Sequence, residues 1–289
     1  MRHRRSPPGL GVLVALALAG CGGDDGDGGG ATPVVEDPGP IHVHGLGVNP
    51  ADGALFIATH TGLFRLADGE SRAERVGDRL QDTMGFTVVG PDRFLGSGHP
   101  DGRDRLPPFL GLVRSTDAGR SWTPVSLLGE ADFHVLEADD RRVYGFGSDF
   151  ESREARFLTS SDRGRSWSRL DPPGPLLSLA IEPGRPDRFV AATTDGLHAA
   201  SRAGREWRAL GGEPGLLSWA GDGTLYRVDA GGAVGASDDR GRSWEERGRV
   251  AGEPAAFEAG GGRLFAALHD GSIVASADGG LSWRVISRP

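Results

Sequence analysis

Apolar and polar positions follow one another in the same order several times between Ile41 and the end of the chain. Each repeat has an apolar stretch, a turn, a second stretch rich in Leu, Phe, Val and Ala, a third stretch, a polar turn ending in tryptophan, and a fourth stretch. Two copies show this plainly, LLSLAIEPGRPDRFVAATTDGLHAASRAGREWRAL at 176–210 and AAFEAGGGRLFAALHDGSIVASADGGLSWRVI at 255–286. Short apolar stretches between Gly-rich turns are typical of strands, so each repeat predicts four strands.

The polar turn is spelled almost identically four times, as STDAGRSW, SSDRGRSW, SDDRGRSW and SADGGLSW from positions 115, 160, 237 and 276. A fifth copy has Ala200 and Arg202 where Ser and Asp stand, and the first repeat lacks the turn. The turn tryptophans recur 37 to 45 residues apart. A period near forty with four strands is typical of propeller blades. We predict an all-β, six-bladed β-propeller of four-stranded antiparallel blades over 41–289, with blades ending near Val76, Val125, Leu170, Leu210, Arg247 and Ile286.

The repeated turn, Ser-x-Asp-x-Gly-x-x-Trp, resembles the Asp-box, or BNR repeat, of sialidases and many other propellers. The resemblance implies a structural role in which the carboxylate accepts backbone N–H bonds, the glycine adopts a conformation unfavourable to other residues, and the tryptophan packs between blades. In that family the turn joins the two outer strands on the face away from the active site. The residues given this role are Asp117, Trp122, Asp162, Trp167, Asp239, Trp244, Asp278 and Trp283.

The first twenty residues have the features of an export signal, a basic start followed by a short apolar stretch that is too short to span a membrane. They end in Leu-Ala-Gly before Cys21, the only cysteine, which resembles the bacterial lipoprotein signal and implies lipidation of Cys21. We predict a signal peptide over 1–20, a flexible Gly/Asp/Pro tether over 21–40, and anchoring at the outer face of the cell membrane. Ring closure is either by packing alone or through a strand added by Val34 and Val35.

The charge balance excludes one class of partner. The formal net charge is -8, with 32 basic residues that are all arginine. An acidic chain is not suited to phosphate backbones, so we expect no nucleic-acid partner. The partners that remain are the membrane through Cys21, a small ligand, and an envelope protein.

Histidines distinguish the first repeats from the others. Alignment of the first strands places one set at the channel rim in blades one to three, where blades four and five have Pro175, Leu177, Gly215 and Leu217. A second set follows the second strand of blades one, two and six, and both sets are expected to face the same mouth of the ring. This rim would carry His42, His44, His60, Met84, His99, His134 and His269, with Asp82 and Asp132.

Imidazole, carboxylate and thioether groups are ligands of transition metals. The thioether points toward copper, whereas imidazole is also compatible with zinc. The rim is therefore a candidate copper or zinc site. The alternative is that these side chains hydrogen-bond only with one another and with solvent.

Other residues are candidate contacts for a small ligand. Two longer loops, 97–111 and 148–157, are expected on the same face and carry Arg103, Arg105 and Arg153. Mixed charge in such loops is also ordinary solvation. Trp219, the only tryptophan outside the turns, is either a stacking platform for a sugar or a core residue.

Two functions stay open at this point. Bacterial lipoproteins with the same layout, which this chain resembles in HVHGLGVNP, FLGSGHPDG and LGLVRSTDAGRSW, are commonly described as sialidase-like or glycosyl hydrolase-like. We expect an envelope lipoprotein that binds a metal ion or a glycan at the histidine rim. The alternative is a glycoside hydrolase acting on cell-surface or environmental glycans, with Asp82 and Asp132 as its carboxylate pair. A true sialidase is disfavoured, because Tyr144 and Tyr226 lie mid-strand rather than at a nucleophile position.

Overall fold

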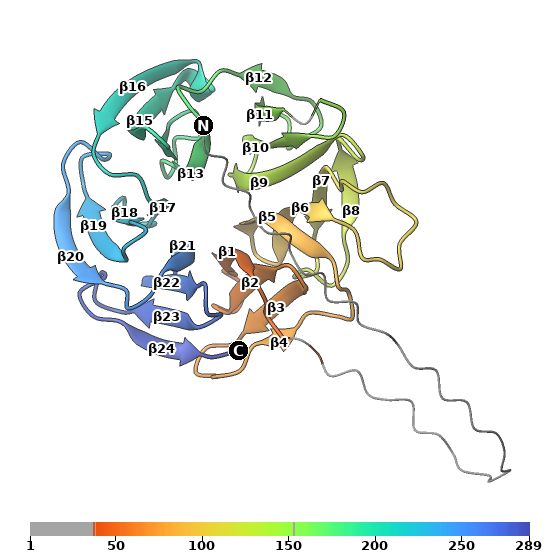
Figure 1. Cartoon of the computed structure of the whole chain (residues 1–289), viewed down its shortest axis with the longest axis horizontal. Coiled ribbons are helices and arrows are strands. Elements are labelled where there is room, and N and C mark those ends of the chain that lie inside the picture. Colours follow the sequence, from red (N-terminus) through yellow and green to blue (C-terminus); the bar gives the residue numbers. More distant parts are fainter. Residues whose placement is uncertain (1–36, 38, 153) are drawn as a thin grey trace, which may run out of the picture. The chain divides into compact units, whose positions relative to one another are not determined.

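The computed structural model describes residues 37, 39–152 and 154–289. The predicted signal peptide, Cys21 and most of the tether lie outside the described residues. The chain divides into two units, Met1–Asp37 and Pro38–Pro289, and the second forms six four-stranded antiparallel sheets. Figure 1 shows these sheets as blades around an axis, each built from four consecutive strands. The predicted six-bladed β-propeller is therefore confirmed.

The first three blades contain twelve strands. Blade one has β1 (Val43–Val48), β2 (Leu55–Thr59), β3 (Gly62–Leu66) and β4 (Glu74–Arg75). Blade two has β5 (Asp82–Gly90), β6 (Arg93–His99), β7 (Leu112–Ser115) and β8 (Thr123–Ser126). Blade three has β9 (Ala131–Ala138), β10 (Val143–Asp149), β11 (Ala155–Ser160) and β12 (Ser168–Leu170).

The last three blades repeat this order. Blade four has β13 (Leu176–Ile181), β14 (Phe189–Thr193), β15 (Gly196–Ser201), the short 3-10 helix η1 (Arg202–Gly204) and β16 (Glu206–Gly211). Blade five has β17 (Leu216–Trp219), β18 (Leu225–Val228), β19 (Ala233–Ser237) and β20 (Glu245–Arg249). Blade six has β21 (Pro254–Gly260), β22 (Arg263–Leu268), β23 (Ile273–Ser276) and β24 (Arg284–Ser287). Among the described residues, no helix is long and apolar enough to cross a membrane.

The hydrophobic core is divided among the blade interfaces. Each of six buried clusters draws its side chains from two neighbouring blades. Between blades one and two, the ring of Phe94 lies 4.7 Å from that of Phe56 and 5.5 Å from that of Phe86. Burial of one such side chain contributes about 1.5–3 kcal/mol. A blade thus buries its two faces only against its neighbours, which requires the repeats to continue around the ring.

The ring closes between blades six and one. Phe265 and Ile273 pack with Leu55 and Ile57 in one buried cluster, and Arg263 pairs with Asp68 at 2.8 Å. Within the described residues, each of these blades contains only its own four consecutive strands. Closure there is by packing, and the strand considered for Val34 and Val35 lies outside the described residues.

The repeated turn joins the third and fourth strands of blades two, three, five and six. In blade three, Asp162 accepts the backbone N–H of Ser166 at 2.9 Å and the Ser166 hydroxyl at 2.6 Å. These bonds hold the pKa of Asp162 well below its usual range, and the bond from the Ser166 hydroxyl has the largest effect. The hydroxyl of Ser160 accepts the buried N–H of Gly164, which has a φ of +81°. In blade four, where Ala200 replaces the serine, η1 occupies the turn instead.

Replacing Ser160 by alanine is expected to destabilise the fold by about 1–2 kcal/mol, because the buried N–H of Gly164 loses its acceptor. Urea unfolding monitored by tryptophan fluorescence measures this difference. Ser168→Ala, at an exposed position of strand β12 in the same blade, is the matched control and should leave the midpoint unchanged. Equal stability of the two variants would contradict the structural role of the serine.

Candidate metal site

A β-bulge near the start of the inner strand sets the side chains of the channel mouth. In β1, β5 and β9 the pairing with the second strand skips one residue, which is His44, Met84 and His134 respectively. Strand β13 skips Leu177 and β21 skips Ala255. A bulge re-aims a side chain and commonly lies beside a functional site. The mouth therefore has donor atoms in blades one to three and apolar side chains in blades four and six.

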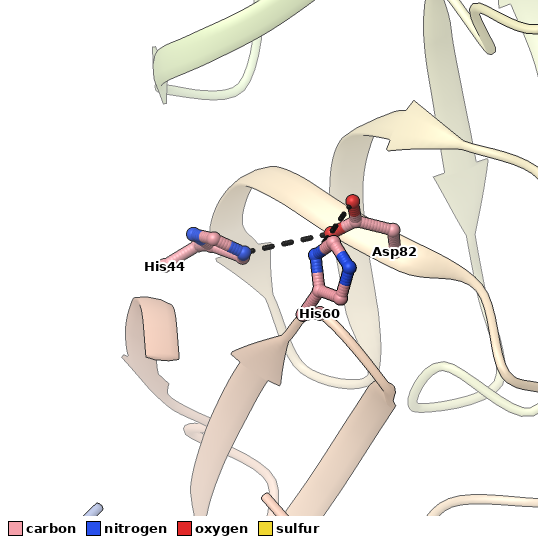
Figure 2. A group of neighbouring side chains, drawn as sticks. All are labelled: His44, His60 and Asp82. Atoms are coloured by element: carbon pink, nitrogen blue, oxygen red, sulfur yellow. Dashed lines mark ion pairs between the residues drawn. The ribbon is translucent and has the colours of Figure 1, made fainter. Parts of the chain in front are cut away.

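His44, His60 and Asp82 form one group at this mouth (Figure 2). His44 is the bulge residue of β1, His60 follows β2 in the same blade, and Asp82 begins β5 of the next blade. The Nε2 atom of His44 lies 3.5 Å from Oδ1 of Asp82, and Nδ1 of His60 lies 3.0 Å from Oδ2. One donor atom from each residue lies within 4.8 Å of the other two. The sequence predicted that these residues share one rim, and in the structure they are in contact.

Two atoms of this group lack a hydrogen-bond partner although they are buried, Nε2 of His44 and Oδ1 of Asp82. Their separation of 3.5 Å is too long for a hydrogen bond. It matches two ligands of one tetrahedral ion, which lie about 3.3–3.5 Å apart when metal–ligand bonds are about 2.0–2.2 Å. Buried polar atoms without a hydrogen-bond partner are unfavourable, so a cation between these two atoms would compensate for the missing bonds.

A second group is centred on Asp132, which lies near the start of β9 and is only 3% exposed. Its Oδ2 atom lies 3.0 Å from Nε2 of His134 and 3.5 Å from Nε2 of His99. The bond to Asp132 raises the pKa of His134, and the more distant charge of Asp82 acts in the same direction. The two groups are neighbours, because Asp82 and His99 are paired across β5 and β6.

The other predicted metal ligands lie outside the first group. The His42 ring is 6.1 Å from that of His60, in an edge-to-face arrangement. His269 has the position in blade six that His60 has in blade one. Its side chain is 62% exposed and lies 4.0 Å from that of Glu253. Met84 is half-buried in β5. Its sulfur takes part in none of the contacts that define the first group.

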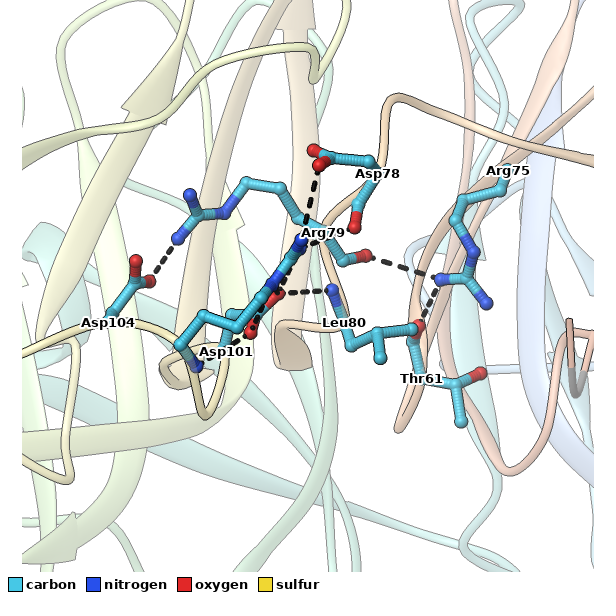
Figure 3. A network of polar contacts seen from close by, with 8 residues as sticks. Thr61, Arg75, Asp78, Arg79, Leu80, Asp101 and Asp104 are labelled. Atoms are coloured by element: carbon cyan, nitrogen blue, oxygen red, sulfur yellow. Dashed lines mark hydrogen bonds and ion pairs between the residues drawn. The ribbon is translucent and has the colours of Figure 1, made fainter. Parts of the chain in front are cut away.

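The predicted ligand contact Arg103 serves to hold the loop that carries it. Arg103 donates to both carboxylate oxygens of Asp101, at 2.7 to 3.1 Å, and lowers the pKa of that buried carboxyl. Figure 3 shows the network around it, in which Leu80 donates its backbone N–H to Asp101 at 2.8 Å and Arg79 pairs with Asp104. Exposed Arg105 lies in the same loop, and Arg153 lies outside the described residues.

Trp219 lies at the other end of the inner strands from the histidines. Leu216 begins β17 beside a cavity that His44 and His134 also line, whereas Trp219 ends the strand. There it borders a cavity of about 550 Å³ between blades four and five, together with Trp207. Its indole N–H donates to the carbonyl of Gly223 at 2.8 Å. A sugar stacked on Trp219 would thus occupy a different site from a metal ion at the mouth.

The sequence interpretation missed a pair of carboxyl groups inside the channel. Glu137 of β9 and Glu258 of β21 line the same cavity of about 260 Å³. Burial raises the pKa of Glu258 to about 7, although Ser218 donates a bond of 3.3 Å to it. Burial, with the charge of Glu258, raises the pKa of Glu137 well above its usual value. A repeat alignment continued three residues past each bulge would have found them.

Comparisons with known proteins give the fold and no family. No protein-family model matches the chain, and no curated protein matches it. A solved structure of XC5397 from Xanthomonas campestris, described as a gluconolactonase, is similar with a TM-score of 0.62 and 17% identity, covering 79% of this chain and 83% of that one. A chain of a nidogen/laminin complex is similar with a TM-score of 0.63 and 14% identity, covering 82% and 93% respectively. At these identities the likeness shows the β-propeller alone.

Proposed function

We propose that this chain is a metal-binding propeller of the cell envelope that holds one divalent transition-metal ion through His44, His60 and Asp82. The export signal and the lipid anchor at Cys21 are sequence predictions, and they would place the protein at the outer face of the cell membrane. The repeat resemblance to Asp-box propellers is compatible with this function without implying it.

The proposal depends on one observation, the meeting of three donor atoms of which two are buried without a hydrogen-bond partner. Two imidazoles and one carboxylate suit zinc and related divalent ions, and three protein ligands leave one position open for water or a small ligand. The net charge of -8 favours the approach of a cation.

A small cavity beside His44 favours an ion over a glycan at this position. The cavity that His44 and His134 line has a volume of about 100 Å³, whereas ligand pockets usually have about 300–1,000 Å³. At about 30 Å³ per water molecule, it corresponds to a few waters. Glycoside hydrolysis by Asp82 and Asp132 gains no specific support, because each carboxylate is in contact with an imidazole ring.

Titration of the demetallated protein with cobalt(II), followed by zinc competition, tests the proposal. The parent should bind cobalt with the visible absorption of a site that contains nitrogen ligands, and Asp82→Asn should weaken binding at least tenfold. Affinity should also fall as the solution is made acidic, because a protonated imidazole cannot bind a metal ion.

The matched control is His269→Gln. This residue has the position of His60 in its own blade, but its nearest carboxylate, Glu253, lies 4.0 Å away. The control variant should bind cobalt as the parent does. Equal loss in both variants, or no loss in Asp82→Asn, would overturn the assignment.

A further inference from the structure

The pseudo-symmetry of the ring relates the first metal group to a second set of residues. In blade one, Thr59 pairs with the residue before the bulge, and His60 follows it. In blade two, Gly98 has this position opposite Thr83, and His99 follows it. His44 therefore corresponds to Met84, and His60 corresponds to His99.

The carboxylate completes the correspondence. Asp82 stands two residues before the bulge of blade two, and Asp132 stands two residues before the bulge of blade three. His60 contacts Asp82 of the next blade at 3.0 Å, and His99 contacts Asp132 of the next blade at 3.5 Å. A rotation by one blade thus converts the first group into Met84, His99 and Asp132. Among the described residues, one further rotation gives His134, Ser148 and Pro175, which no longer provide three good donors.

The contacts of His99 leave its Nε2 atom facing a carboxylate oxygen, an arrangement that needs a proton or a metal ion between the two atoms. Its Nδ1 atom lies 2.9 Å from the carbonyl oxygen of Pro108, which can only accept, so Nδ1 carries a proton. In the neutral ring, the lone pair of Nε2 then faces an oxygen of Asp132 at 3.5 Å. Two acceptors in this arrangement repel each other unless a proton or a metal ion lies between them. The other oxygen of Asp132 is buried without a hydrogen-bond partner.

The surroundings are those of a metal ligand rather than of a free side chain. A metal-bound histidine usually donates its other N–H to a carbonyl or carboxylate, as His99 does to Pro108. The loop that carries Pro108 is held to the preceding blade connection by Asp101 and Leu80 (Figure 3). His134 contacts Asp132 at 3.0 Å and fixes the carboxylate. The long loop of blade two thus has a role in orienting His99.

We propose that Met84, His99 and Asp132 form a second metal site, selective for copper(I), one blade away from the first. The proposal deepens the proposed metal function and rests on it. The thioether of Met84 is a soft ligand that selects copper(I), whereas imidazole and carboxylate are also ligands of zinc, so the preference for copper rests on Met84. The exchange of His44 for Met84 between two equivalent positions would give the mouth two sites of different metal preference.

The first test uses Met84→Leu, which keeps the volume of the side chain and removes the sulfur. Anaerobic titration with copper(I) against a chromogenic chelator should show at least tenfold weaker binding in this variant. X-ray absorption of the copper-loaded parent should show a sulfur neighbour that the variant lacks. Unchanged copper(I) affinity, or no sulfur neighbour in the parent, would overturn the second site.

The second test uses Met84→His, which copies the first site into the second position. This variant should bind two cobalt(II) ions per chain where the parent binds one. An unchanged stoichiometry in a variant whose circular dichroism matches the parent would contradict the symmetry on which the site rests.

The two metal proposals can fail separately. Loss of cobalt binding in Asp82→Asn reports the first site, whereas the dependence of copper(I) binding on Met84 reports the second. Copper(I) binding that depends on Met84, in a parent that does not bind cobalt, would sink the first site and support the second. Cobalt binding that depends on Asp82, with copper(I) binding indifferent to Met84, would do the reverse.

Discussion

Replacement of Gly98 by alanine is expected to destabilise the propeller by about 3 kcal/mol and to weaken cobalt binding at least tenfold. Gly98 has a φ of +137°, which residues with a Cβ rarely adopt. An added Cβ would overlap the carbonyl oxygen of Asp82 and approach the backbone N of Met84 at 2.9 Å. Both are backbone atoms, so neither can rotate away, and the strand start that carries Asp82 must move.

Urea unfolding and cobalt titration of the same variant measure the two effects. Gly102→Ala is the matched control, because an added Cβ at that loop position would meet no atom within 4 Å and its backbone is not left-handed. The control should differ from the parent by less than about 0.5 kcal/mol. Parent-like stability and affinity in Gly98→Ala would mean that the close approach of β5 and β6 does not hold Asp82 in place.

The propeller could be predicted from the sequence because its repeats are local. The same apolar pattern and the same turn return in each unit, and each blade is made of consecutive residues. The predicted ends at Leu170 and Ile286 lie within one residue of the ends of β12 and β24. Arg247 lies two residues before the end of β20. Loss of the turn motif in blades one and four did not obscure them, since the strand pattern continues without it.

The candidate site was less predictable because it depends on contacts between blades. The alignment placed His44 and His60 at one mouth, but it could not show that His60 meets Asp82 of the next blade. That contact depends on a bulge and on the lateral offset of neighbouring sheets. The hydrophobic pattern of the sequence indicates neither the bulge nor the offset. The alignment also placed His269 at this mouth, but it could not show which of the histidines form the group of His44, His60 and Asp82.

The buried carboxyl groups show a different limit of sequence reasoning. Glu137 and Glu258 are ordinary charged residues in half-buried strands, and only closure of the ring makes both line one channel. At the equivalent positions, other blades have Gly47, Thr87 and Ala180, which add no charge. The local sequence pattern does not distinguish these two glutamates, yet their ionised forms become unfavourable once ring closure buries them.

Stability of the parent is expected to fall as the pH rises from about 4.5 to about 7, and Glu258→Gln should reduce this fall by about 3 kcal/mol. The raised pKa of Glu258, about 7 against a usual 4.5, means that the folded chain keeps a proton that the unfolded chain has released. Between these values the folded state binds more protons than the unfolded state, so unfolding becomes easier as pH rises. Above the folded pKa the penalty is complete and constant.

Urea unfolding at about pH 5 and about pH 8 measures this difference, and the comparison with the variant isolates Glu258. His134 and Glu137 also have raised pKa values, so they contribute in the same direction in both proteins. Their contributions cancel in the comparison, except for the part of the Glu137 shift that the charge of Glu258 causes. Glu246→Gln, on exposed strand β20, is the control and should keep the pH dependence of the parent. If Glu258→Gln were no more stable than the parent at the higher pH, the channel would not be imposing a desolvation penalty on Glu258, and the carboxyl pair would be solvated like a surface group.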